Sequence, residues 1–388
     1  MTDRLAARVD ARLRSLREAG LLRTLRAPAG IDLSSNDYLD LARDPRVVAA
    51  FQQGVAREGA GSTGSRLLRG HRDAFVEVER AFAAFKGAER ALYFSSGYLA
   101  NLGVLTTLPE AGDVIVSDER NHASLIDAMR LSSATRVIVP HNDPAALEDA
   151  LRAARSAAAA DARLFVVVES VFSMDGDAAP LAAQAALCRT FDATLVVDEA
   201  HACGLWGARG SGMIEAAGLD PNTISINSAG KALGVGGAFV AGPAWAIDYL
   251  VQRARTFVFS TAPPPAVTGA IAESLRIVEA EPERRARVIA LARLARERLV
   301  AAGIDVPAGD SPIVPIVIGD SHRAAAVAAR LQARGFDIRA IRPPTVPDGG
   351  ARLRLSVNAR LEDATIVEFV AALSAVLEEV TPWSAVTS

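Results

Sequence analysis

Seven short, β-rich runs between residues 91 and 242 constrain the fold more than any other feature of this sequence. Several of these runs are apolar along their whole length, which is typical of strands buried on both faces of a mainly parallel sheet. Most of the stretches between them are rich in Ala, Leu and Arg, as helices are. This alternation predicts an α/β fold with three layers. The runs are ALYFSS (91–96), DVIVSD (113–118), TRVIVPH (135–141), RLFVVVES (163–170), ATLVVDEA (193–200), TISINSAG (223–230) and AFVAG (238–242).

The segment TAPPPA (261–266) ends this alternation and introduces a different pattern. A helical region over 267–302 comes first, and strand-like runs and further helices follow it to the end of the chain. The strand-like runs are IVPIVIG (313–319) and ARLRLSV (351–357). This order predicts a smaller α+β domain at the C-terminus. We therefore expect an N-terminal helical and extended segment (1–45), a large α/β domain (46–275) and a small C-terminal domain (276–388).

The composition argues against several classes of protein. The net charge of −3 over 388 residues gives no reason to expect a nucleic-acid partner. Two cysteines are too few for a disulfide framework or a metal cluster, so we expect no metal and a reduced, cytoplasmic setting. The N-terminus mixes Arg with acidic residues, lacks the apolar core of a secretory signal and predicts an amphipathic surface helix. The uncharged run 232–247 is too short and too rich in glycine to span a bilayer.

Lys231 is a lysine in a chain that otherwise uses arginine. Among 42 basic residues, Lys86 and Lys231 are the two lysines. Lys231 lies in the glycine-rich stretch SINSAGKALGVGG (225–237), where a surface charge has no obvious use. Lysine can lose its proton and act as a nucleophile, whereas arginine stays protonated. Lys231 is therefore either a reactive amine or an ordinary solvated side chain.

The stretch LVVDEAHACG (195–204) resembles the magnesium-binding box of a helicase. That function also requires a phosphate loop of the form GxxxxGK[ST]. The one Gly-Lys pair of the chain is followed by Ala232, and Ser225 stands where the first glycine is required. The sequence therefore argues against an ATPase.

The order of Asp198, His201 and Lys231 along the chain favours a different chemistry. Asp198 and His201 follow one predicted strand and Lys231 follows the next, and ligands of open α/β sheets collect at such strand ends. An aspartate beside a pyridinium nitrogen and a lysine that can form a Schiff base are the protein groups that pyridoxal 5′-phosphate (PLP) requires. Taken singly, Asp198 would be a helix cap and His201 a hydrogen-bonded core residue.

Three further strand ends offer groups for such a cofactor. Gly97 in SSGYLAN (95–101) opens a helix whose free N–H groups suit a phosphate. His122 could stack on a ring, and Ser173 in FSMDGD (172–177) follows another strand. Taken alone, each is equally compatible with ordinary capping or turn chemistry.

With these motifs in place, the chain resembles the α-oxoamine synthases, a PLP-dependent group with the aspartate-aminotransferase fold (fold type I). Members of the group join an amino acid to an acyl thioester with loss of CO2. The resemblance runs almost from end to end. It is carried by SSNDYL (34–39), GAGSTGSRLLRG (59–70), SSGYLAN, NHASL (121–125), ESVFSMDGD (169–177), VVDEAHACGLWG (196–207), the lysine turn, FSTAPPP (259–265), RPPTVP (342–347) and RLRLS (352–356).

The resemblance implies a role for each candidate residue of the cofactor site. Lys231 would bind PLP covalently and then move the Cα proton of the amino acid. Asp198 would hold the proton of the pyridine nitrogen, and His201 would bond the phenolic oxygen with Ser173 nearby. His122 would stack on the ring and is a candidate acid. The phosphate would lie near Ser96, Gly97, Tyr98 and Ser228, and Ser260 and Thr261 would reach the phosphate of a neighbouring subunit in a homodimer with shared sites.

The same resemblance implies the substrates. Arg354 would bind the amino-acid carboxylate, for which its planar fork is suited. Arg342 and Thr345 of RPPTVP would read the acyl end, and Asn36, with the loop around Ser65 and His71, would shape the acyl entrance. The stretch AIRPPTVPDGGARLRLS (340–356) is most similar to members that join L-alanine to a pimeloyl thioester of CoA or of acyl carrier protein.

Other activities remain open at this point. A sister enzyme, such as one of the glycine C-acetyltransferase or 5-aminolevulinate synthase type, would use glycine or serine with another acyl-CoA. An aminotransferase is possible because a fold does not fix a reaction. A catalytically inactive partner subunit should lack the lysine that this chain retains. Two departures from the group, at Ala202-Cys203 and Ser228-Ala229, bear on substrate detail because neither removes a reacting group.

Overall fold

The computed structural model describes residues 3–380, which form two compact units. The larger unit comprises Asp37–Ser173 and Asp177–Ala286, and the smaller unit comprises the rest of the described chain. These bounds differ from the expected divisions after residues 45 and 275. Of the expected N-terminal segment, residues 3–36 belong to the smaller unit and residues 37–45 to the larger, and the second boundary follows Ala286. Each unit is described here by itself.

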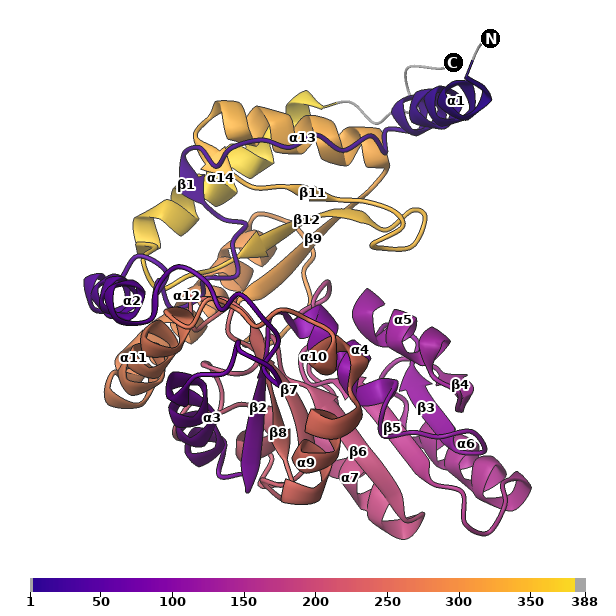
Figure 1. Cartoon of the computed structure of the whole chain (residues 1–388). Coiled ribbons are helices and arrows are strands. Elements are labelled where there is room, and N and C mark those ends of the chain that lie inside the picture. The colour runs from indigo at the N-terminus through magenta and orange to yellow at the C-terminus, as the bar shows by residue number, and fades with distance from the viewer. Residues whose placement is uncertain (1–2, 381–388) are drawn as a thin grey trace. The chain divides into compact units, whose positions relative to one another are not determined.

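A seven-stranded sheet forms the centre of the larger unit (Figure 1). Its order is β2-β8-β7-β6-β5-β3-β4, and β8 is antiparallel to both of its neighbours while the remaining pairs are parallel. A turn of nine residues joins β7 to β8, and so short a connection can form only an antiparallel pair. All seven predicted strands are confirmed: β2 (Arg90–Phe94), β3 (Val114–Asp118), β4 (Thr135–Val139), β5 (Leu164–Glu169), β6 (Ala193–Asp198), β7 (Ile224–Ser228) and β8 (Ala238–Gly242).

Helices cover both faces of this sheet, so the predicted three layers are confirmed. In β5, Phe165 and Val167 join one hydrophobic core, whereas Val166 and Val168 join the other, because successive side chains of a strand point to opposite faces. The first face packs on α4 (Gly97–Leu105), α5 (Ala123–Leu131), α9 (Ala244–Arg253) and α10 (Arg255–Val258). The second packs on α6 (Pro144–Ala157), α7 (Leu181–Thr190) and α8 (Met213–Ala216).

Three more helices complete the larger unit. They are α2 (Pro45–Glu58), α3 (Asp73–Lys86) and α11 (Val267–Ala280), and α11 packs on both of the others. Helix α3 lies against β2 and β8, where the ring of Phe82 stacks on that of Phe239 at 4.1 Å between centroids. This packing brings Lys86, the last residue of α3, into the interior of the unit.

The smaller unit contains a three-stranded antiparallel sheet of order β11-β12-β9. A parallel pair of β1 with β10 joins the N-terminal segment to this unit, which is why residues 1–45 do not form a separate part. Its elements are α1 (Arg4–Glu18), β1 (Ile31–Asp32), most of α12 (Pro282–Ala301), β9 (Ile313–Gly319), α13 (Ser321–Ala333), β10 (Phe336–Asp337), β11 (Ala340–Ile341), β12 (Ala351–Ser356) and α14 (Asp363–Glu379).

The expected single helix over 267–302 is wrong in one respect. Helix α11 ends at Ala280, and α12 begins at Pro282. Glu281 leaves the helical conformation, with φ −122° and ψ 64°. Proline has no N–H to continue the helical hydrogen bonds but is well accepted in the first turn of a new helix.

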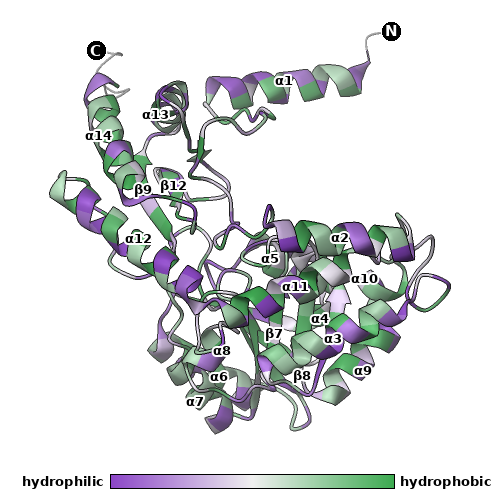
Figure 2. Ribbon diagram, turned by 90° about the vertical axis from the view of Figure 1, so that its left-hand side faces the viewer, coloured by the Kyte–Doolittle hydropathy of each residue, from purple (hydrophilic) through white to green (hydrophobic). Residues whose placement is uncertain are grey.

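Helix α1 confirms the predicted N-terminal helix. Figure 2 shows hydrophilic and hydrophobic residues alternating along it. None of its side chains is buried, so Leu5, Val9, Leu13 and Leu16 are exposed. Within residues 3–380, no helix is both long enough and apolar enough to cross a membrane.

Candidate active site

The carboxyl ends of five strands meet at one edge of the large sheet. Strands β2, β3, β5, β6 and β7 all run in the same direction, so the segments that follow them share this edge. These segments contain the residues that the sequence singled out, at Ser96–Tyr98, His122, Ser173, Asp198–His201 and Ser228–Lys231. The edge is where ligands of open α/β sheets bind.

The lysine of the glycine-rich turn contacts a histidine of the neighbouring strand end. Lys231 Nζ lies 2.9 Å from His201 Nε2, and Lys231 is half-buried. The other ring nitrogen of His201 lies 2.7 Å from the hydroxyl of Tyr38, which is fully buried. Tyr38 therefore fixes the ring of His201 from the side opposite to Lys231, and the sequence analysis did not assign it a role.

Asp198 and His122 are linked through two residues that sequence reasoning missed. The amide nitrogen of Asn101, on α4, donates to Asp198 Oδ2 and to Ser124 Oγ, each at 2.8 Å. Ser124 Oγ in turn lies 2.7 Å from His122 Nδ1. Asp198 is buried, and its other oxygen accepts the N–H of Ala200 at 2.9 Å. Each carboxylate oxygen thus accepts one hydrogen bond from the protein, which holds the group in place.

His122 is placed where its ring can meet a ligand. It is the N-cap residue of α5, and its residue surface is exposed. Desolvation of the ring lowers its pKa below the usual value, and the charge of Lys231 acts in the same direction while that of Asp198 opposes it. A ring with a lowered pKa is neutral at pH 7, as an imidazole that stacks on an aromatic ring should be.

Glu169 is a second carboxyl at this edge and was also missed. It lies at the end of β5, directly opposite Asp198 in the pairing with β6. Burial and the neighbouring charge of Asp198 raise its pKa to about 8, although Lys231 and the N–H groups of Ser173 and His122 oppose the shift. Its Oε1 has no hydrogen-bond partner among the described residues. Glu169 is therefore largely protonated at pH 7.

The start of α4 offers an open cradle. Ser96 caps the helix by accepting the N–H of Leu99 at 3.2 Å. A Cβ built on Gly97 would meet only the Cβ of Ala238, at 4.0 Å, so the space above the first turn is left open by the protein itself. Ser228 lies at the end of β7, where its hydroxyl accepts the N–H of Gly230 at 3.2 Å. The Tyr98 hydroxyl points elsewhere and donates to Asp127 at 2.6 Å, so its backbone N–H is the group left for this cradle.

In the smaller unit, two of the predicted substrate residues come together. Arg354 is buried in β12, and its guanidinium donates to Asn36 Oδ1 at 3.0 Å and to Ser356 Oγ at 2.9 Å. Arg342 donates instead to the backbone carbonyls of Gly20 and Leu22.

Thr345 is exposed, and its hydroxyl accepts from Arg23 at 3.3 Å. Arg23, which the sequence analysis did not consider, is therefore a further cation beside the RPPTVP segment.

Ser260 and Thr261 follow α10 and are about thirty residues beyond Lys231 in the sequence. Thr261 forms an isolated antiparallel bridge with Ser65, which joins the FSTAPPP segment to the SRLLRG loop. Leu67, Leu68 and Phe259 beside this bridge are exposed by 49%, 79% and 71%. The bridge therefore presents an apolar surface.

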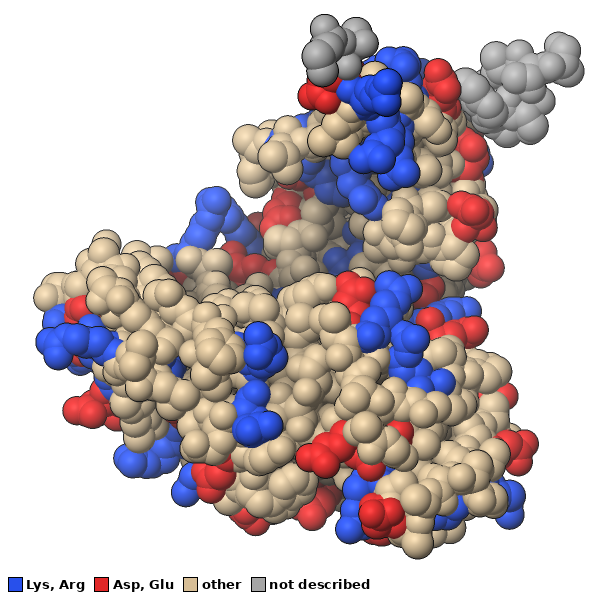
Figure 3. Space-filling model, turned by 45° about the vertical axis from the view of Figure 1, so that its right-hand side comes forward, with Lys and Arg blue, Asp and Glu red and all other residues tan. Residues whose placement is uncertain are grey.

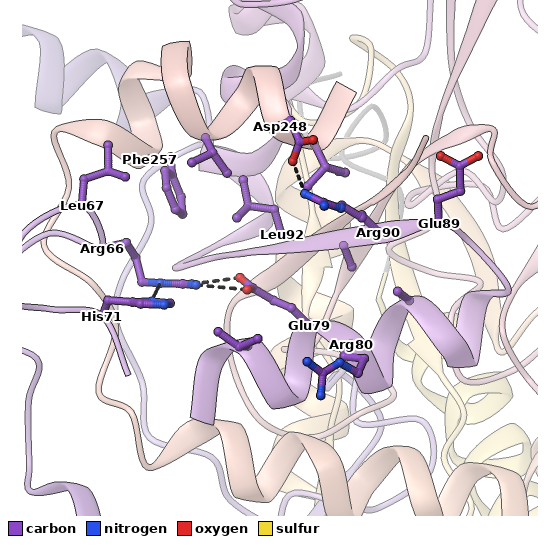
Figure 4. Close-up of a pocket in the computed structure, with 15 residues that line it drawn as sticks. Arg66, Leu67, His71, Glu79, Arg80, Glu89, Arg90, Leu92, Asp248 and Phe257 are labelled. Carbon is purple, nitrogen blue, oxygen red and sulfur yellow. Dashed lines mark hydrogen bonds and ion pairs between the residues drawn. The ribbon is translucent and has the colours of Figure 1, made fainter. Parts of the chain in front are cut away.

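A surface cavity of about 580 Å³ between α3, β2 and α9 lies elsewhere in the larger unit (Figure 4). Several of its charged side chains pair with each other. Arg66 binds Glu79 through two contacts of 2.9 and 3.0 Å and His71 at 3.0 Å, while Arg90 binds Asp248. None of the strand-end residues above lines it. No group of three or more metal-ligating side chains occurs within residues 3–380.

Comparison with known proteins agrees with this geometry. Residues 28–373 match the family model described as aminotransferase class I and II. The chain belongs to this family. Its members of fold type I bind PLP, so the cofactor and the fold expected from the sequence are confirmed.

Individual relatives narrow the comparison. The chain is 47% identical to the 8-amino-7-oxononanoate synthase of Anaeromyxobacter dehalogenans over 354 residues, or 91% of this chain and 87% of the relative. A serine palmitoyltransferase structure from S. paucimobilis, with bound PLP and myriocin, superimposes with a TM-score of 0.89 at 29% identity, covering 97% of this chain and 99% of that one. An 8-amino-7-oxononanoate synthase from Francisella tularensis superimposes with a TM-score of 0.77 at 28% identity, covering 90% and 98%.

The strand-end residues of this chain fit PLP. Asp198 offers a carboxylate oxygen for a pyridinium N–H, and Lys231 offers an amine. The N-terminus of α4 offers free N–H groups under an open space. Buried side-chain oxygens of Asn101, Glu169 and Asn227 have no hydrogen-bond partner among residues 3–380, so this edge is polar and leaves acceptors for a ligand.

Proposed function

We propose that this protein is an 8-amino-7-oxononanoate synthase, which joins L-alanine to a pimeloyl thioester with loss of CO2. The observation that carries the proposal is the meeting of Lys231, His201 and Asp198 at one edge of the sheet. The relatives that bear this name, at 45–47% identity over most of the chain, support it.

The cofactor supplies the electronic part of the reaction. PLP bound at this edge withdraws electron density from the amino-acid Cα and so makes the Cα proton removable. Asp198 keeps a negative charge beside the ring nitrogen, and Asn101 and the Ala200 N–H hold that carboxylate in place. His201, fixed by Tyr38, donates toward the cofactor's phenolic oxygen.

Lys231 and His122 are the groups that move protons. Lys231 would hold the cofactor through its amine, and the same amine would take the Cα proton of alanine. The acyl carbon then bonds to Cα, the thiol leaves, CO2 is lost from the former carboxylate and a proton returns to Cα. His122, a neutral imidazole exposed at this edge, can accept a proton and return it during these steps.

Arg354 and the RPPTVP segment are the residues to which we assign substrate recognition. Arg354 binds the alanine carboxylate, since its guanidinium is already oriented by Asn36 and Ser356 and a planar fork can bind a carboxylate through two hydrogen bonds. Arg342 and Thr345 contribute to recognition of the pimeloyl end. The Arg342 guanidinium also donates hydrogen bonds to the carbonyls of Gly20 and Leu22, and so holds this backbone segment in place.

A homodimer completes the site. An exposed apolar surface next to Ser260 and Thr261 favours contact with a second copy of the chain; it consists of Leu67, Leu68 and Phe259. Ser260 and Thr261 would then reach the phosphate of the PLP bound to that second copy. Figure 3 shows broad uncharged areas on the larger unit between scattered charges, as such a contact requires. The two cysteines, Cys188 and Cys203, are free and buried, which suits the cytoplasm.

The test is a product assay with the PLP-loaded protein. L-Alanine, glycine and L-serine are each offered with pimeloyl-CoA and with pimeloyl-acyl carrier protein, and products are identified by mass. The proposal predicts 8-amino-7-oxononanoate from alanine with at least one of the two thioesters. A product from glycine or serine alone would move the protein to a sister activity.

A further inference from the structure

The second lysine of the chain forms a buried ion pair directly beside the candidate site. The Lys86 side chain is 1% exposed and that of Glu199 is 0% exposed. Lys86 Nζ donates to Glu199 Oε2 and to the carbonyl of Ser211, the latter at 2.6 Å. Glu199 Oε1 accepts the N–H of Ile214 at 3.0 Å. The pair therefore ties together the end of α3, the segment after β6 and the start of α8.

Glu199 also organises the turn that carries His201. Its own N–H donates to the carbonyl of Ile226 in β7 at 2.7 Å, and its carbonyl accepts the N–H groups of Ala202 and Cys203 at 2.9 Å each. His201 lies between these anchored positions. Any displacement of Glu199 would therefore move the backbone on both sides of His201.

Alternation along the chain places Glu199 on the side opposite to Asp198. Val196 of β6 belongs to the core under α4 and α5, and Val197 to the core under α7 and α8. Asp198, two positions after Val196, lies on the same face as Val196 and accepts a hydrogen bond from Asn101 of α4. Glu199, two positions after Val197, lies on the other face and accepts the N–H of Ile214 in α8. One carboxylate thus faces the cofactor side, and its neighbour is fixed behind it.

Stability alone is a weak reason for this pair. Replacing a buried ion pair by apolar groups of similar size is often neutral or stabilising, whereas such pairs can fix one arrangement of a site. The space around Glu199 is also tight, because a Cβ built on Gly212 would lie 2.5 Å from Glu199 Oε1. A compact ammonium suits such a space better than a guanidinium does, in a chain that otherwise uses arginine.

We propose that Lys86 is a positioning residue of the cofactor site, which acts through Glu199 to hold Asp198 and His201 in their places relative to Lys231. The inference rests on the cofactor roles proposed above for Asp198 and His201. Lys86 itself contacts neither the cofactor nor the substrate. Its loss should therefore change how PLP is bound, beyond any change in the stability of the fold.

The experiment compares the Lys86→Met/Glu199→Gln double variant with the parent protein and with Arg155→Met. The double variant removes both charges, so no unpaired ion is left in the interior. Arg155 is a matched control because it binds three carbonyls, of Ala162, Phe191 and Asp192, at the opposite ends of the strands. Three quantities are measured: the midpoint of thermal unfolding without PLP, the Kd of PLP, and the pH midpoint of the visible band of bound PLP.

The proposal predicts that the double variant binds PLP about tenfold or more weakly and shifts the pH midpoint of its band, as loss of outer partners does in other sites. Lys86→Arg should show a smaller change in the same direction. Arg155→Met should leave both PLP quantities at the parent values even where it lowers the unfolding midpoint. Parent-like PLP binding and band in the double variant would overturn the proposal, as would changes in proportion to the unfolding midpoint across all variants.

Asp198→Asn and His201→Asn separate this inference from the proposed function. If these two variants weaken PLP binding and the Lys86 variants do not, the site stands and the positioning role fails. If neither Asp198→Asn nor His201→Asn affects the cofactor, the assigned site itself is wrong.

Discussion

The side chains of the two lysines of this chain contact the same three-residue segment, 199–201, but lie in different environments. Lys86 is buried and bonded to a carboxylate and a carbonyl, while Lys231 is half-buried in a glycine-rich turn beside a histidine. Their partners, Glu199 and His201, are two residues apart. A buried lysine bonded to a carboxylate and a backbone carbonyl holds structure, whereas a half-buried lysine beside a histidine suits a reacting amine. Residue type therefore says less about role than the acceptors around the amine.

The comparison predicts first that Lys231→Ala removes the chemistry and leaves the fold. Activity should fall by about 10⁴-fold or more, because the nucleophile and proton carrier is lost. The visible band of bound PLP should disappear. The free energy of unfolding without cofactor should change by no more than about 1 kcal/mol, since no buried ion is left unpaired. Steady-state assays, absorbance and urea unfolding check the three parts, and appreciable residual turnover would show that another group does this work.

Lys86→Met, unlike Lys231→Ala, should strongly lower the free energy of unfolding of the PLP-free protein. It leaves the Glu199 carboxylate buried without its cation, and breaking a buried pair costs about 3–5 kcal/mol. Urea unfolding measures this loss. Adding Glu199→Gln should recover most of it, because the unpaired charge is then gone. A Lys86→Met protein as stable as the parent would mean that this pair does not tie the three segments together.

His141 is another basic side chain at this edge of the sheet, and its charge depends on pH in the range where stability can be measured. It lies between Asp118, at 2.9 Å, and Asp177, at 2.7 Å, and these hydrogen bonds outweigh burial and raise its pKa to about 9. A folded-state pKa above the unfolded value stabilises the fold fully below about pH 6.5, and this contribution is lost as pH rises through about 9. His141→Gln should therefore cost about 2–3 kcal/mol at pH 6 and much less at pH 9.5. Unfolding at both pH values checks this, with His322→Gln as a control at a half-buried histidine whose ring contacts the carbonyl of Glu18.

Glu169 is neutral in the fold at pH 7, whereas His141 is charged, and we expect its effect on the free energy of unfolding to be smaller. Burial and Asp198 raise its folded-state pKa to about 8, so its proton is retained on folding and stability falls as pH rises from about 4.5 to 8. Glu169→Gln removes the group that must ionise. Between pH 6 and pH 8 the parent should lose about 2 kcal/mol relative to the variant. Equal pH dependence of the two proteins would show that Glu169 ionises in the fold at its ordinary pH.

The sequence predicted the sheet and one edge of the site for physical reasons. Strands buried on both faces must be apolar throughout, so β5 and β6 are visible as continuous runs. Parallel strands share one carboxyl edge, so Asp198 and Lys231 could be placed together before any coordinates. The break at Pro282 was readable from the proline but was missed within an otherwise helical composition.

The remaining contacts depend on pairs that are far apart in the sequence. Lys86 and Glu199 are 113 positions apart, and Tyr38 and His201 are 163 apart. Asn101 stood inside a quoted motif, but its link to both Asp198 and Ser124 follows from how α4 and α5 pack on the sheet. Local pattern carries no information on such partners, since only the folded chain brings their acceptors within reach.

The most direct test of the account is to find which lysine carries the cofactor. The PLP-loaded protein is reduced with borohydride, which fixes the bond between the cofactor and an amine, and its peptides are sequenced by mass spectrometry. Because the chain has two lysines, the result is nearly a single choice. The account predicts the phosphopyridoxyl group on Lys231 and none on Lys86. A label on Lys86, or no labelled lysine in a protein that binds PLP, would contradict it.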